Sequence, residues 1–162
     1  MTMKITVDRV SQVLASIQEL AGKQVLVGIP ATKASRDNED KSPLNNAQIG
    51  YIMENGSPIA NIPARPSLIP GVEDQMESIT AHLEKAAKAA MSGNAEKVDD
   101  ELNATGLIAQ AGVRNRITNG DFAPLAKSTL AARRKRGRTG VKPLIDTSQL
   151  RNAMTYVIRK KD

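Results

Sequence analysis

The spacing of apolar residues in the first part of the chain predicts a helix followed by a strand. The helix lies between a capping residue, Asp8, and a stop signal, Gly22. Its buried face is expected to consist of Val10, Val13, Leu14, Ile17 and Ala21. Residues 24–29 are rich in β-branched side chains and are followed by Pro30, so they predict a short buried strand that lies centrally in a sheet.

Two long helices are predicted in the middle of the chain. The first begins at Ser67 or Val72 and is broken by Gly93. Its apolar seam is formed by Val72, Met76, Ile79, Leu83, Ala86 and Ala90. Asn94 caps the second helix, and residues 119–120 end it. Its inner stripe is formed by Val98, Leu102, Thr105, Ala109, Val113 and Ile117. The short connection between these helices predicts an antiparallel pair.

Shorter elements complete the prediction. A helix is expected over residues 47–55 after an Asn46 cap, another over 124–134, and a closing strand over 153–159. Residues 31–45 and 133–142 lack apolar periodicity and predict mobile loops. We therefore expect a single α+β domain over residues 1–162, with a small antiparallel or mixed sheet packed against two long helices and several short helices.

Composition narrows the class of protein. Aromatic residues make up 2% of the chain, so the core must be built from aliphatic side chains and much Ala. Small side chains bury little area each, so we expect modest stability that assembly with other copies supplements. The absence of Cys excludes a disulfide framework, a thiolate metal site and a Cys nucleophile. Without a signal-peptide pattern or a membrane-spanning run, we expect a cytosolic protein with no membrane partner.

The net charge of +6 is concentrated in one segment. Its basic residues are Arg133, Arg134, Lys135, Arg136 and Arg138. They suit contact with phosphates or with an acidic protein surface. Because no aromatic residue is interleaved to stack on bases, a solvated segment or one that docks on an acidic partner is favoured over a dedicated nucleic-acid site. If the protein contacts DNA without sequence specificity, these residues are expected to carry the contact.

The sequence offers little material for catalysis. His82 is the single histidine and lies beside Leu83 on a predicted helix, where an ordinary polar contact is favoured over a catalytic role. The acidic clusters at residues 39–40 and 99–101 are expected to face solvent. No phosphate-binding loop, dinucleotide-binding glycine turn or nucleophile elbow is present in the sequence. We therefore expect a protein that is not an enzyme and needs no cofactor or metal.

Two Pro-centred segments stand out against this background. In residues 61–66, Pro63 and Pro66 fix φ and make a stiff connector into the first long helix. Arg65 between them is expected to bind a carboxylate, in the same subunit or, preferably, in a neighbouring copy. In residues 142–147, Pro143, Leu144 and Ile145 form a rigid apolar clip, after which Asp146 or Thr147 can cap a turn.

These segments also carry a resemblance. Residues 51–58, Tyr-Ile-Met-Glu-Asn-Gly-Ser-Pro, precede Asn-Ile-Pro-Ala-Arg-Pro at 61–66, and Phe-Ala-Pro-Leu at 122–125 precedes Thr129 and Lys-Pro-Leu-Ile-Asp-Thr-Ser-Gln-Leu at 142–150. From about Gln24 onward, this ordered set resembles the neck or tail-completion proteins of long-tailed bacteriophages. The chain departs from that pattern at Ser67, where Phe is usual, and at Ser148, where Gly is common.

The resemblance implies a non-enzymatic virion protein at the head-proximal end of the tail. Its expected partners are other copies of itself, arranged as a ring, and other phage neck or tail proteins. Its expected location is the virion, and the host cytoplasm during assembly. The candidate assembly residues are Ile62, Pro63, Arg65, Pro66, Pro143, Leu144 and Ile145. The alternative is a small basic protein that binds DNA without sequence specificity.

Overall fold

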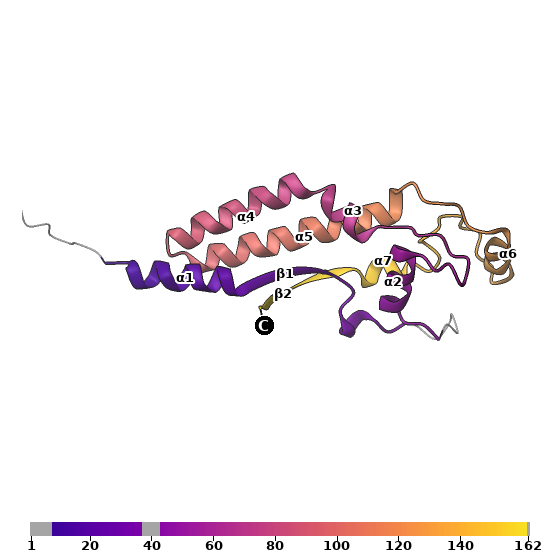
Figure 1. Ribbon diagram of the computed structural model, residues 1–162, viewed down its shortest axis with the longest axis horizontal. Helices are drawn as coiled ribbons and strands as arrows, with labels where there is room; N and C mark the ends of the chain where they lie inside the picture. The colour runs from indigo at the N-terminus through magenta and orange to yellow at the C-terminus, as the bar shows by residue number, and fades with distance from the viewer. Residues whose placement is uncertain (1–7, 37–42, 162) are drawn as a thin grey trace, which may run out of the picture. The chain divides into compact units, whose positions relative to one another are not determined.

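The computed structural model describes residues 8–36 and 43–161, which fold into seven α-helices and a two-stranded antiparallel sheet (Figure 1). The elements in chain order are α1 (Val10–Gly22), β1 (Lys23–Gly28), the short 3-10 helix η1 (Ala31–Lys33), α2 (Asn46–Asn55), α3 (Leu68–Glu73), α4 (Met76–Met91), α5 (Ala95–Asn119), α6 (Lys127–Lys135), α7 (Gln149–Ala153) and β2 (Thr155–Lys160). The predicted α+β class is confirmed, as is the packing of two long helices, α4 and α5, with a small sheet.

The chain divides into two compact units. Among the described residues, unit 1 contains 8–26, 76–108 and 157–161. Unit 2 contains 27–36, 43–75 and 109–156. The helix α5 and both strands contribute residues to each unit. No helix of the described residues has the length and apolar character needed to cross a membrane.

Unit 1 is built on the helices α4 and α5. They run side by side in Figure 1 and are joined at Gly93, whose φ of 74° favours glycine. The Asn94 side chain accepts a hydrogen bond from the Lys97 N–H at 3.0 Å, as the predicted cap requires. The core of the unit consists of Ala89, Ala90, Val98 and Leu102, with Leu20, Val25 and Ile158 packed against it.

The sheet covers this core with one face. The Lys161 N–H donates to the Gly22 carbonyl at 2.7 Å, which sets Val25 opposite Ile158 in the antiparallel register. Both side chains pack against the core of unit 1. Because successive side chains alternate along a strand, Leu26 and Val157 lie on the other face, and both are exposed. In the described residues β1 pairs only with β2, so the prediction of a central strand is wrong.

The helix α1 ends at Gly22 as predicted, but it begins one residue later than an Asp8 cap predicts, and a different face is buried. Ser16 is its buried residue, because α1 packs against α4 on that side and a small side chain permits close approach. Four residues predicted to be buried are exposed: Val10 by 64%, Leu14 by 53%, Ile17 by 40%, and also Ala21. Asp8 precedes the capping residue Arg9, and its carboxylate accepts a hydrogen bond from the Val10 N–H at 3.0 Å.

The first long helix is interrupted. Residues 74–75 separate α3 from α4, and of the predicted seam Met76 and Leu83 are exposed. The direction of α3 is set by its crossing with α5: a Cβ on Gly112 would lie 2.2 Å from the Gly71 carbonyl oxygen. The close crossing also explains a glycine within α5.

The predicted inner stripe of α5 is confirmed, because all of its members are buried: Val98, Leu102, Thr105, Ala109, Val113 and Ile117.

Unit 2 has its own core beneath more irregular chain. Its buried members are Val113, Ile117, Leu144, Leu150 and Met154. The helix α2 is capped by Asn45, one residue before the predicted cap, in a reciprocal capping box with Gln48. The predicted loop over 31–45 contains η1, and the Asn46 N–H closes it by donating to the Ala34 carbonyl at 2.8 Å. Residues 37–42 of that loop lie outside the described residues.

Candidate functional site

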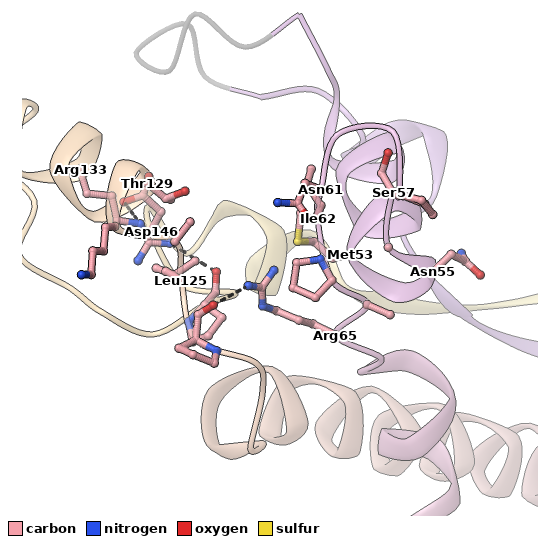
Figure 2. A pocket seen from close by; sticks show the side chains of 18 of the residues that line it. Met53, Asn55, Ser57, Asn61, Ile62, Arg65, Leu125, Thr129, Arg133 and Asp146 are labelled. Atoms are coloured by element: carbon pink, nitrogen blue, oxygen red, sulfur yellow. Dashed lines mark hydrogen bonds and ion pairs between the residues drawn. The ribbon is translucent and has the colours of Figure 1, made fainter.

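The two Pro-centred segments line one cleft in unit 2. The cleft has a volume of about 930 Å³. Figure 2 shows Met53, Ile62 and Asn61 on one side of it and Leu125, Thr129 and Asp146 on the other. Its apolar lining comes mainly from Met53, Pro58, Ile62, Pro63, Pro124, Leu125 and Pro143, and its charged lining from Arg65, Lys127, Arg133, Arg136 and Asp146. The chemistry of this lining suits an occupant with both apolar and acidic groups.

The wall formed by residues 61–66 is folded against the end of α2. The carboxylate of Glu54 accepts hydrogen bonds from the backbone N–H groups of Ser67 at 2.7 Å, Leu68 at 2.9 Å and Ile69 at 3.2 Å. These N–H groups begin α3, where a negative charge is favourable. The Arg65 N–H also donates to the Met53 carbonyl at 2.6 Å. The last turn of α2 therefore fixes the end of the connector and the start of α3.

Gly56 allows the chain to reverse between α2 and this wall. Its φ is 75°, and a Cβ there would lie 2.8 Å from the Ala64 backbone nitrogen. The reversal is held by paired backbone hydrogen bonds between Ser57 and Ile62, at 2.8 and 2.9 Å. Ile59 lies at the tip of the turn and is fully exposed.

Arg65 ties one wall of the cleft to the other. It is 5% exposed, and burial lowers the pKa of its guanidinium from the ordinary value. Its Nε donates to the Ala123 carbonyl at 2.9 Å and its Nη2 to the Pro124 carbonyl at 3.1 Å. Figure 2 shows the Arg65 side chain reaching from one wall of the cleft toward the other. Within the described residues its partners are thus carbonyl oxygens of the same subunit rather than the expected carboxylate. A contact of Arg65 with a neighbouring copy stays a prediction.

Arg133 organises the second Pro-centred segment. Its Nη1 donates to the carbonyls of Gly140 at 2.9 Å, Lys142 at 2.9 Å and Ile145 at 3.0 Å. Arg133 is 5% exposed, so its guanidinium is engaged inside the fold and is not available as the predicted phosphate contact. One buried side chain therefore gathers the carbonyl groups of a segment that has no helix or strand.

Asp146 forms ion pairs with three of the basic side chains. Its carboxylate lies 3.3 Å from Arg133 Nε, 3.6 Å from Arg136 Nη2 and 2.9 Å from Arg138 Nη1. The residue at the cap of α7 is Ser148, and its side chain makes no capping bond. A turn cap by Asp146 or Thr147 stays a prediction. The Asp146 carboxylate balances the charge of the arginines around the cleft. Whether residues 133–142 move before a partner binds stays a prediction.

The predicted site residues therefore fall into two groups. Leu144 is buried in the core of unit 2, and Ile145 packs against that core. Pro63 and Pro66 are exposed, as are Arg134 and Lys135, and neither of these two basic side chains forms an ion pair with a described carboxylate. The basic segment thus has an inward half that builds the fold and an outward half that faces solvent.

Comparisons of the chain with protein-family models, curated proteins and solved structures found no match. The function must therefore be argued from the residues and their arrangement.

The described residues offer no alternative site of evident chemistry. They contain no group of three or more His, Cys, Asp and Glu side chains that could hold a metal ion. His82 lies in unit 1, where its Nδ1 is 2.6 Å from a carboxylate oxygen of Glu101. This is the ordinary polar contact that the sequence predicts for it.

Glu54 and Arg133 are the structural residues that sequence reasoning missed. A signal for Glu54 does exist: an acidic residue in the last turn of a helix opposes the helix dipole, which indicates another use for the carboxylate. No comparable signal exists for Arg133, since it stands among other basic residues and only its burial distinguishes it.

Proposed function

We propose that this protein is a structural component of a bacteriophage neck, or tail-completion protein, which acts at the head-proximal end of the tail as part of a ring. The observation that carries the proposal is the convergence of both resemblance-bearing segments on one cleft. The segments are far apart in the sequence, and a shared binding surface accounts for their occurrence together.

The cleft is suited to hold a segment of a neighbouring protein. Its walls are held by the Glu54, Arg65 and Arg133 contacts, so little conformational entropy is lost when a partner binds. Apolar side chains provide burial, and Lys127 and Arg136 provide positive charge at the lining. The partner segment that fits this chemistry is extended and carries apolar and acidic residues.

The test uses the phage or prophage that encodes the protein. We expect deletion of the gene to leave heads and tails that fail to join, as seen by electron microscopy of lysates. Complete, infectious particles from the deletion strain would overturn the proposal. For the cleft, Lys127→Glu is the informative complementing variant, because Lys127 is exposed and lines the cleft. We expect it to lower the yield of joined particles, while Lys97→Glu on α5 does not.

The alternative function rests on the exposed pair Arg134 and Lys135. A protein that binds DNA through them should shift labelled duplex DNA in electrophoresis, with affinity that falls steeply as salt rises. The double variant Arg134→Glu, Lys135→Glu should abolish the shift and retain the fold. Tight binding at moderate salt that this variant loses would favour the alternative over the neck function.

A further inference from the structure

An apolar row on α1 is left without a partner in unit 1. Val10, Leu14, Ile17 and Ala21 follow one another at helical spacing and are all exposed. The row lies about 100–160° around the helix from the buried Ser16. The apolar face of α1 is therefore wider than the part that α4 covers.

The composition of this helix differs from that of an ordinary surface helix. Residues 10–18 contain no charged side chain, although charged residues make up 25% of the whole chain. A solvent-facing helix face normally carries charges, whereas depletion of charge is characteristic of the centre of a protein interface. The row thus has the character of an interface core rather than of a hydrated surface.

The open face of the sheet carries two further exposed apolar side chains. The helix α1 continues directly into β1, and Leu26 and Val157 lie on the face of the sheet that is turned away from the core of unit 1. In Figure 1, α4 and α5 lie on one side of α1, and the described part of unit 1 places no element on the other side. A specific interface takes roughly 800 Å² from each partner, so a helix of about 20 Å contributes one part and the sheet another.

We infer that this surface, formed by Val10, Leu14, Ile17, Ala21, Leu26 and Val157, binds a second copy of the chain. Charge identifies the occupant. Two copies with a net charge of +6 each repel one another, and contact costs least where neither presents a charge. An anionic membrane or an acidic partner would instead select basic residues on the helix, and residues 10–18 provide none.

The inference deepens the proposed function, because the idea of a ring rests on that proposal. It states which part of the subunit contacts the next copy and leaves the cleft of unit 2 for other partners. It also accounts for an Ala-rich core of low buried area in unit 1, since assembly removes further apolar surface from water. Its test uses isolated protein, so its failure is distinct from a failure to join heads and tails.

The decisive pair of variants is Leu14→Lys and Leu107→Lys. Both leucines are 53% exposed and both belong to unit 1, but Leu107 lies on α5, outside the proposed surface. We expect the wild-type protein to form a concentration-dependent oligomer in light scattering after gel filtration. Leu14→Lys should weaken the association by about tenfold or more, because a charge is placed in an apolar contact, and Leu107→Lys should leave it unchanged.

A second measurement follows the surface itself. The chain has no Cys, so Leu14→Cys and Leu107→Cys each create a unique thiol. We expect a maleimide to label the thiol at 14 slowly in concentrated protein and faster on dilution, and the thiol at 107 equally fast in both. A monomeric wild-type protein at high concentration would overturn the inference. So would equal association of the two Lys variants, or unprotected labelling at 14.

Discussion

The two units achieve order by different means. Unit 1 consists of regular helices and strands around Ala89, Ala90, Val98 and Leu102, and burial of apolar side chains holds it together. Unit 2 also has an apolar core, but much of its chain is irregular and is held by side chains that bind backbone groups. The irregular walls of the cleft are therefore as defined as a helix would be, because Glu54, Arg65 and Arg133 satisfy the backbone groups that no helix or strand pairs.

This difference predicts which substitutions should destabilise each unit most. In unit 2 the polar clamps should dominate stability, and in unit 1 single polar contacts should matter little.

Loss of the Arg133 clamp should be the most damaging change. Arg133→Met leaves four carbonyl groups and the Asp146 carboxylate without their buried partner. We expect the free energy of unfolding to fall by about 3 kcal/mol in urea denaturation. Arg134→Met, at the exposed neighbouring position, should change it by less than about 0.5 kcal/mol. Equal effects of the two changes would contradict the structural role of Arg133.

The helix crossing in unit 2 should tolerate no side chain. In Gly112→Ala the new Cβ meets the Gly71 carbonyl oxygen and the Gln75 side chain, so α3 and α5 must separate. We expect a loss of about 2 kcal/mol in thermal or chemical unfolding. The control is Gly22→Ala at the end of α1, where a Cβ would meet no atom within 4 Å. A Gly112→Ala protein as stable as wild type would show that the crossing is looser than described.

A change at Ser148 should stabilise unit 2. Ser148 has a φ of 59° before α7, a left-handed conformation that costs residues with a Cβ roughly 1–2 kcal/mol. Ser148→Gly should therefore raise the free energy of unfolding by about 1 kcal/mol, seen as a higher midpoint in thermal unfolding. The same change at Asn61, with a φ of 51°, should gain less because Asn tolerates this conformation better. A lower midpoint for Ser148→Gly would contradict this account.

The smallest effect should come from the ion pairs of unit 1. Burial tends to lower the pKa of Lys23, but its hydrogen bonds and attraction to Asp99 and Glu19 outweigh burial and raise that pKa. The stabilisation is therefore complete below the unfolded value of 10.5 and is lost as pH rises through the folded value.

The matching variant is Lys23→Met. Since the side chains of Glu19 and Asp99 are 41% and 47% exposed, we expect the variant to lose at most about 1 kcal/mol near neutral pH. The difference from wild type in urea unfolding should shrink as pH is raised above about 10.5. A difference that grows with rising pH would contradict the sign of this linkage.

The sequence predicts the features of the fold that leave a repeating pattern of buried apolar residues, and it does not predict the others. The α5 stripe from Val98 to Ile117 is predictable because burial imposes a period on it. The buried side of α1 is not, because its apolar face is wider than its contact with α4 and the period alone cannot choose between neighbouring rows. From the sequence alone, Gly112 can only be judged unfavourable for a helix. The structure shows why a glycine is needed there, because the backbone of Gly71 leaves no room for a Cβ.

In the cleft, local pattern predicts the stiff segments but not what fixes them. Three prolines and a glycine indicate rigid turns at residues 56–66 from the sequence alone. The partners of Arg65 lie 58 and 59 residues further along the chain, and carbonyl groups are present at every residue, so no pattern marks them. Contacts between a side chain and a distant backbone group are the class that such reasoning fails to find.

The Glu54 cap has a consequence for the order of folding. Glu54 meets Ser67 across only 13 residues, so the loop entropy for this contact is smaller than for the Arg65 contacts. The turn that carries the first Pro-centred segment should thus form early and locally, and the opposite wall should dock afterwards. In stopped-flow kinetics, Glu54→Gln should then slow folding, while Arg65→Met should mainly accelerate unfolding. We therefore expect the wall of the cleft that contains residues 61–66 to form first and the opposite wall to pack against it.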